Sequence, residues 1–348
     1  MPRVAMTLQP RTLQPRTLQA MACLALLLGC STPPPHPQGS PQHSLQNSPP
    51  AAQPGQTARP SREPVALGPS SGCDAGDPLR PGVHTLTHDG QPRRYLLALP
   101  RAAGPRPLVL DLHGLGGTPA RQSAYSRLAE QGTGRGYIVA TPQASPEAIG
   151  WGLPGLFGPD DAGFLGALLD ELERRLCVDT RREFAAGMSM GAGMATGLIC
   201  GLDGRLAGVA AVAGLNIVPP CERAGPATIV AFHGTADRIV PYDSGHPFQD
   251  QRGRLRALAD LITLPPVEDT FRRWAQIFRC RRDVAAAQGQ VRVREWRSCA
   301  GGAVLRLYTV RGGGHTWPGA VPIGRLGRTD PLGATALILD AFDAAARR

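Results

Sequence analysis

Ser189 has the type and the surroundings of a nucleophile in acyl-transfer chemistry. It is the central residue of Gly187-Met188-Ser189-Met190-Gly191, between an apolar run typical of a buried strand and a small-residue run compatible with a helix. A serine at such a turn, with glycine two residues away on each side, fits the nucleophile-elbow pattern. The turn strains the serine backbone, and glycines leave room for the neighbouring chain. The Met190 N–H would then point to the position of a developing oxyanion.

A serine hydroxyl needs an imidazole to remove its proton and a carboxylate to orient that imidazole. Asp237 follows the apolar run 227–232, and His315 follows the run 305–310 within a glycine-rich loop. We predict Ser189 as nucleophile, Asp237 as orienting carboxylate and His315 as general base. A turn-forming aspartate and a surface-loop histidine are the alternatives. His233, just before Asp237, is predicted to brace the loop.

Buried strands that alternate with helices are predicted to position these residues. Apolar runs predict strands at 107–113, 137–140, 183–186, 206–212, 227–232 and 305–310, helices at 120–130, 160–176, 192–200, 265–279 and 333–346, and a hairpin turning at 89–90. The alternation predicts an α/β protein with a mostly parallel central sheet and helices on both faces. Sites in such sheets lie at the carboxyl ends of strands, where the candidate residues fall. The stretches 141–159 and 242–265 have no readable pattern.

Four stretches resemble the α/β-hydrolase esterase family of polyhydroxybutyrate depolymerase-like and feruloyl esterases. They read LHGLGG, CVDTRREFAAGMSMGAGMA, FHGTADRIVPY and GGGHTWPG, and the resemblance extends from about Gly72 to Trp317. It implies the α/β-hydrolase fold and the same three catalytic residues. It also implies the amides of Leu115 and Met190 as oxyanion donors. By the same resemblance, pocket-lining or loop-holding roles fall to Trp151, Asp160, Asp161 and Trp317.

The resemblance implies a carboxylic ester hydrolase that acts through an acyl-enzyme. Feruloyl, acetyl and similar esters of plant polysaccharides are the first substrate class, and short polyhydroxyalkanoate esters are the second. A peptidase or acyltransferase on the same scaffold, and a tethered binding protein with inactive residues, are alternatives from other classes. An aromatic content of 5% argues against a broad sugar-stacking platform.

The net charge of +10 comes from arginine alone, because the chain contains no lysine. No block of consecutive basic residues and no base-stacking platform accompanies it, so we predict no nucleic-acid partner. His84, His88 and His246 lack metal-ligand spacing, and we predict neither a metal nor another cofactor. An ester substrate is the expected partner of a monomeric enzyme.

The N-terminal residues have the pattern of an export signal. Arg11 and Arg16 precede a short apolar run at 20–29. The segment Leu27-Leu28-Gly29-Cys30 resembles a bacterial lipobox, which implies lipidation of Cys30. We predict a signal peptide at 1–29, a Pro/Ser/Gln-rich tether at 30–70 and a catalytic domain at 71–348. The protein would be extracytoplasmic and lipid-anchored to the outer membrane or cell surface. A plain signal peptide and a secreted protein are the alternative.

Six cysteines remain once Cys23 is removed with the signal peptide and Cys30 is lipidated. An even number outside the cytoplasm predicts disulfides. Cys200 and Cys221 bracket one strand or loop excursion, as do Cys280 and Cys299, so we predict these two pairs. Cys73 and Cys177 are left over, and their bond would fasten the N-terminal hairpin to the sheet.

Overall fold

The computed structural model describes residues 67–155 and 158–347, all within the unit Arg62–Arg348. The predicted signal peptide, Cys30 and nearly all of the tether lie outside the described residues. In the part that is described, no helix has both the length and the hydrophobicity to cross a membrane.

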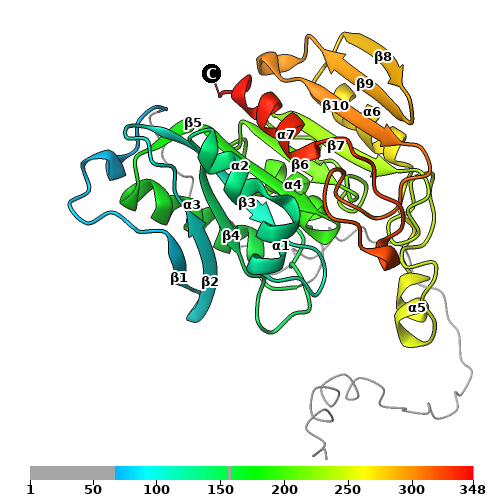
Figure 1. Ribbon diagram of the computed structural model, residues 1–348, viewed down its shortest axis with the longest axis horizontal. Helices are drawn as coiled ribbons and strands as arrows, with labels where there is room; N and C mark the ends of the chain where they lie inside the picture. Colours follow the sequence, from blue (N-terminus) through cyan, green and yellow to red (C-terminus); the bar gives the residue numbers. More distant parts are fainter. Residues whose placement is uncertain (1–66, 156–157, 348) are drawn as a thin grey trace, which may run out of the picture. The chain divides into compact units, whose positions relative to one another are not determined.

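A 10-stranded sheet lies at the centre, in the order β1-β2-β4-β3-β5-β6-β7-β10-β9-β8 (Figure 1). The central strands are parallel to one another: β4 (Ile138–Pro142), β3 (Arg106–Leu112), β5 (Val178–Met188), β6 (Gly208–Val212), β7 (Thr228–Gly234) and β10 (Leu305–Val310). Antiparallel hairpins extend both edges: β1 (Gly82–His88) with β2 (Gln91–Ala98), and β9 (Val291–Arg297) with β8 (Arg282–Gln288). The predicted mostly parallel α/β architecture is confirmed.

Helices cover both faces of the sheet (Figure 1). One face carries α1 (Pro119–Ser126), α2 (Leu128–Gly134) and α7 (Ala334–Asp343), and the other carries α3 (Asp161–Arg175), α4 (Met190–Gly201) and α6 (Val267–Ile277). Successive strand residues point to opposite faces, so Leu108 and Leu110 join one core while Val109 joins the other. This two-sided burial is the reason the central strands read as continuous apolar runs.

The prediction of one continuous helix at 120–130 is wrong. The segment is divided at Arg127, whose φ of 54° is left-handed and separates α1 from α2. The cause is the preceding residue, Ser126. Its hydroxyl donates to the buried carboxylate of Asp111 at 2.6 Å and accepts the N–H of Leu128 at 3.2 Å. A tertiary hydrogen bond therefore replaces helix continuation at this point.

In the described part of the chain, the β8–β9 hairpin, α5 (Arg254–Ala259) and three short 3-10 helices were not predicted. All residues of β8 are exposed, so its sequence carries no apolar alternation. The strand pairs only with β9 and forms the edge of the sheet. Arg294 of β9 pairs with Asp283 of β8 at 2.7 Å. Patterning cannot reveal a strand that buries neither face.

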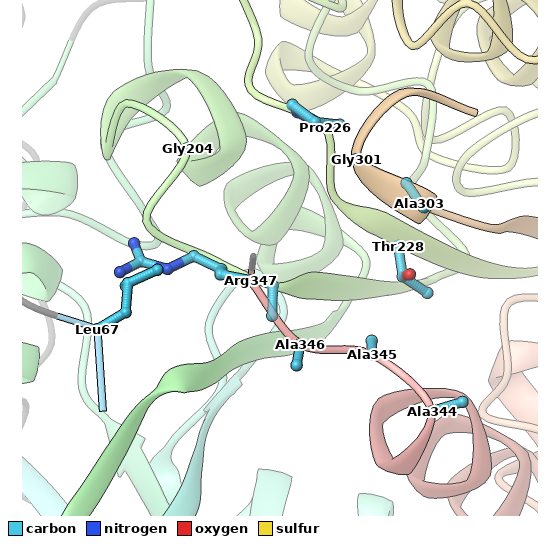
Figure 2. Close-up of a pocket in the computed structure, with 12 residues that line it drawn as sticks. Leu67, Gly204, Pro226, Thr228, Gly301, Ala303, Ala344, Ala345, Ala346 and Arg347 are labelled. Atoms are coloured by element: carbon cyan, nitrogen blue, oxygen red, sulfur yellow. The ribbon is translucent and has the colours of Figure 1, made fainter. Parts of the chain in front are cut away.

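A cavity of about 380 Å³ opens at the amino-terminal ends of β6 and β7 (Figure 2). It is lined by Thr228, the first residue of β7, and by the C-terminal residues 344–347. The described lining contains no imidazole, thiol or carboxylate. The predicted catalytic residues lie instead after the carboxyl ends of the parallel strands β5, β7 and β10.

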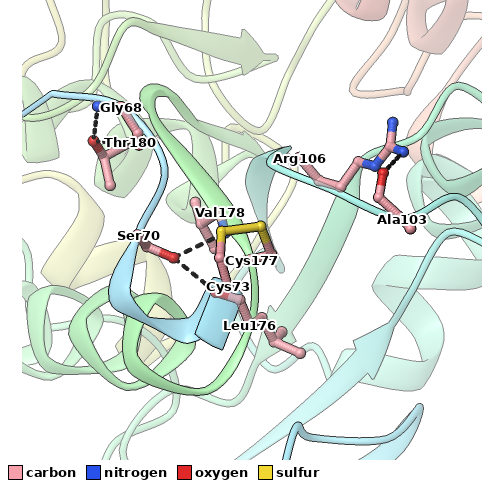
Figure 3. The surroundings of a disulfide bond; sticks show 9 residues. All are labelled: Gly68, Ser70, Cys73, Ala103, Arg106, Leu176, Cys177, Val178 and Thr180. Carbon is pink, nitrogen blue, oxygen red and sulfur yellow. Dashed lines mark hydrogen bonds between the residues drawn. A yellow bond between two sulfur atoms is a disulfide. The ribbon is translucent and has the colours of Figure 1, made fainter. Parts of the chain in front are cut away.

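All three predicted disulfides are confirmed: Cys73–Cys177, Cys200–Cys221 and Cys280–Cys299. The first differs from its prediction in what it fastens. It joins η1 (Ser71–Asp74) to the residue before β5 (Figure 3). The N-terminal hairpin is held instead by pairing of β2 with β4. Ser70 strengthens the disulfide-linked junction, because its hydroxyl donates to Leu176 O at 2.8 Å and accepts Val178 N–H at 2.9 Å. Three disulfides are typical of a protein that works outside the cytoplasm.

Candidate active site

Ser189 lies at a sharp turn between β5 and α4. Its φ and ψ of 56° and −123° are in a region that non-glycine residues rarely adopt. A Cβ on Gly187 would lie 2.3 Å from Gly191 O, and one on Gly191 would lie 2.2 Å from Leu112 O. Both flanking positions therefore require glycine. The Ser189 N–H donates to Val212 O at 2.8 Å, which ties the turn to β6.

Asp237 and His315 meet at the ends of neighbouring strands, β7 and β10. Nδ1 of His315 lies 2.8 Å from Oδ2 of Asp237. The other carboxylate oxygen accepts the N–H groups of Ile239 and Val240, both at 2.9 Å. The carboxylate is thus fixed by its own loop before it contacts the imidazole, 78 residues further along the chain.

Electrostatics keep Asp237 ionised. Burial by itself would raise its pKa, but hydrogen bonds from His233 and His315 outweigh burial and hold the pKa of this carboxyl well below its usual range. A carboxylate is an acceptor only, so the proton of a neutral His315 ring belongs on Nδ1. Nε2 is then left unprotonated, the state that a general base requires.

Ser189 and His315 line one cavity of about 860 Å³. The walls are mainly apolar, with a few polar groups. The lining residues are His113, Gly114, Leu115, Gly117, Arg121, Gln122, Ala124, Tyr125, Met188, Ser189, Ile239, Phe248, His315, Val321, Ile323, Arg325 and Leu326. Two of the three candidate catalytic side chains are therefore open to the same space, and Asp237 lies buried behind them.

The predicted oxyanion donors belong to two separate segments that meet near the serine. Met190 is the first residue of α4, where helix amides lack an intrahelical acceptor. Leu115 follows Gly114, and a Cβ on that glycine would lie only 3.3 Å from Ser189 Cβ. Across residues 67–155 and 158–347, no protein acceptor takes a hydrogen bond from either amide. Both N–H groups are thus available to a ligand.

His113 holds the turn that carries Leu115. Its Nε2 accepts the N–H of Ala144 at 3.1 Å, so the ring proton is on Nδ1, which lies 2.8 Å from Gly114 O. Burial lowers the pKa of His113, which keeps the ring neutral. The sequence marked this residue only as part of a loop motif; its role as an internal clamp depends on contacts with residues about 30 positions away.

The aromatic and acidic residues singled out in the sequence hold loops. Trp151 Nε1 donates to His113 O at 2.7 Å, and Asp161 accepts Gly152 N–H at 2.8 Å while pairing with Arg93. Asp160 caps α3. Trp317 is buried and donates to Thr335 at 3.0 Å. The resemblance implied either a pocket-lining or a loop-holding role for these four residues, and the contacts support the loop-holding role.

His233 also matches its sequence interpretation. Its Nε2 donates to Val240 O at 2.9 Å and lies 3.5 Å from Asp237 Oδ2. The histidine therefore fixes the 237–240 loop through this hydrogen bond. Its Nδ1 is buried and has no hydrogen-bond partner in the described structure. The described part of the chain contains no group of three or more His, Cys, Asp or Glu that could hold a metal ion.

The chain is similar in sequence to known esterases. The chain is 34% identical over 254 residues to "Putative esterase NocK" of Nocardia uniformis subsp. tsuyamanensis, covering 66% of this chain and 72% of the relative. It is 30% identical over 217 residues to "Feruloyl esterase B" of Piromyces equi, covering 60% of this chain and 39% of that longer relative. Among solved structures, the acetyl xylan esterase from Aspergillus awamori matches with a TM-score of 0.53 at 16% identity, over 75% of this chain and 99% of that chain. No family model matches.

Proposed function

The chain belongs to the α/β-hydrolase esterase family of feruloyl esterases and polyhydroxybutyrate depolymerase-like enzymes, and from this premise we propose that it hydrolyses carboxylic esters through an acyl-enzyme on Ser189. The observation that carries the proposal is the 2.8 Å contact between His315 Nδ1 and Asp237 Oδ2 beside a cavity that Ser189 also lines.

The proposed reaction has two halves. His315 Nε2 removes the hydroxyl proton as Ser189 Oγ attacks the ester carbonyl, and the amides of Leu115 and Met190 stabilise the oxyanion. The same imidazole protonates the leaving alcohol when the ester C–O bond breaks. It then deprotonates a water that attacks the acyl-enzyme and releases the acid. Asp237 stabilises the imidazolium in both halves.

A fluorophosphonate probe tests the nucleophile. We expect wild-type protein and a Ser71→Ala control to be labelled, and Ser189→Ala to be unlabelled and to lose hydrolysis of 4-nitrophenyl acetate by about 10⁶-fold. Ser71 is an exposed serine in η1, which a disulfide joins to the residue before β5, whereas Ser189 follows the carboxyl end of that strand. Labelling that persists in Ser189→Ala would reject this serine as nucleophile. Rates on an ester and an amide of the same acyl group separate an esterase from a peptidase.

We propose feruloyl, acetyl and similar esters of plant polysaccharides as the substrate class, with short polyhydroxybutyrate oligomers as the second candidate. A relative named feruloyl esterase supports the first choice. A panel of methyl ferulate, acetylated xylan and a hydroxybutyrate oligomer distinguishes them. The preferred substrate is the one with the highest kcat/KM, because kcat/KM measures discrimination between competing substrates.

We further propose that the enzyme is a monomer tethered to the membrane through a lipid on Cys30. The lipobox-like segment supports this part of the proposal. Metabolic labelling with an alkyne fatty acid should mark the full-length chain in a bacterial host and fail to mark Cys30→Ser. Equal labelling of the two chains would exclude lipidation at this cysteine. Light scattering of protein lacking residues 1–30 measures the oligomeric state.

A further inference from the structure

The active-site cavity holds two arginines that the proposed reaction does not use. Arg121 lies in α1, shortly after the turn that carries Leu115, and Arg325 lies in η3 (Gly324–Leu326), after His315. Both line the same cavity as Ser189, and both side chains are exposed. Two helical segments far apart in the sequence therefore bring fixed positive charge to the lining of one cavity.

Neither guanidinium is neutralised by the protein. Within the described ranges, no carboxylate lies in ion-pair distance of Arg121 or Arg325, whereas nearby Arg127 pairs with Glu130 at 2.7 Å. The described cavity lining includes no aspartate and no glutamate. The pair is therefore available to a ligand.

The surroundings strengthen the positive field. Apolar side chains such as Ile239, Phe248 and Ile323 line the cavity beside the arginines. Charges beside low-dielectric walls attract opposite charge more strongly than charges on an open surface. Two buried carboxylates contact lining residues of the cavity, and both already have partners: Asp237 is bound by two backbone N–H groups and His315, and Asp111 by Gln122 and Ser126.

We propose that Arg121 and Arg325 form an anion subsite that favours esters carrying a carboxylate near the scissile bond. The inference rests on the proposed ester hydrolysis and narrows its substrate class. Guanidinium groups suit this task because they are always charged and match carboxylate geometry. The carboxylate has two possible sources: a uronate sugar of an esterified polysaccharide, or the free end of a hydroxyalkanoate oligomer.

Matched charged and neutral substrates test the subsite. The first pair is 4-nitrophenyl hemisuccinate and 4-nitrophenyl butyrate, at low ionic strength. The second is the linear 3-hydroxybutyrate dimer and its terminal carboxamide, and the third is acetylated xylo-oligosaccharide with and without a glucuronate branch. The first pair measures charge preference alone, and the other two identify the natural source of the carboxylate.

The variants are Arg121→Gln, Arg325→Gln and the double variant, with Arg223→Gln as matched control. Arg223 is exposed and lies outside the cavity lining. We expect each single change to reduce the charged-over-neutral ratio of kcat/KM by about 3-fold and the double change by about 10-fold, mainly through KM. The control should leave the ratio unchanged. The wild-type ratio should also fall with added salt, because salt screens exposed charges.

The double variant decides the outcome. An unchanged ratio, with neutral-ester activity retained, would overturn the subsite but leave ester hydrolysis standing. If the wild-type protein hydrolyses no ester at all, the proposed function fails, and the subsite is then judged by binding. Ligand-observed NMR on Ser189→Ala should show monoethyl succinate binding about 3-fold or more tightly than diethyl succinate. Loss of that difference with both arginines replaced supports the subsite, and its absence in the parent overturns it.

Discussion

Asp111 and Asp237 are buried aspartates near the carboxyl ends of parallel strands, yet their surroundings shift their pKa values in opposite directions. Asp111, in β3, accepts hydrogen bonds from Gln122 at 2.7 Å and Ser126 at 2.6 Å. Burial raises the pKa of Asp111 to about 6, since these neutral donors only partly oppose the burial. Asp237 is hydrogen-bonded to His315 and to two backbone amides, with His233 3.5 Å away, and its pKa stays below the usual range.

The difference shows what a buried carboxylate needs to remain charged. Neutral donors compensate only part of the lost hydration, whereas histidines can also supply charge. Asp111 therefore serves structure: it anchors Ser126 and Gln122, and so fixes α1 against β3. Asp237 serves chemistry, since an ionised carboxylate is what a developing imidazolium requires.

The largest expected effect is the difference in kcat between variants of Asp237 and of Asp111. Asp237→Asn should reduce kcat by about 10⁴-fold, because an amide can hold His315 in the wrong tautomer and cannot stabilise its cation. Asp111→Asn should retain kcat within about 3-fold, because Asp111 makes no contact with the reacting groups. Steady-state kinetics on 4-nitrophenyl acetate measures both. Comparable losses in the two variants would contradict the division of roles.

The second effect concerns stability and pH. The pKa of Asp111 is about 6 in the folded protein and about 3.9 in the unfolded chain, so the folded state holds an extra proton between these values. Its contribution to the free energy of unfolding is therefore greatest below pH 4 and falls by about 3 kcal/mol as pH rises to 6 and above. Asp111→Asn should remove this dependence. Urea titrations across that range measure it, and identical pH profiles for the two proteins would refute the assignment.

The smallest expected effect concerns His233, which packs beside Asp237 and holds its loop. His233→Leu removes the hydrogen bond to Val240 O and one neighbour of the carboxylate, so kcat should fall by about 10-fold. His233→Gln keeps a donor near the Nε2 position and should recover most of that loss. The acid limb of the pH–rate profile should shift in the leucine variant only. A loss of thermal stability in both variants without a kinetic difference would indicate a purely structural residue.

The sequence by itself determined the local features of this protein. Ser189 between two required glycines, the Asp89-Gly90 hairpin turn and the apolar runs all follow from steric and hydrophobic rules that act within a few residues. The disulfide pairs were also predictable, since two of them close short loops of 21 and 19 residues in sequence separation and leave one choice for the third.

Only the tertiary structure decided which distant groups share an environment. The break between α1 and α2 at Arg127 depends on a hydrogen bond from Ser126 to Asp111 in β3. The strand β8 forms because its backbone pairs with that of β9. The opposite pKa shifts of Asp111 and Asp237, and the presence of Arg121 and Arg325 in the lining of one cavity, have the same origin. Charge and hydration depend on distances through space, and folding sets those distances between residues that lie far apart along the chain.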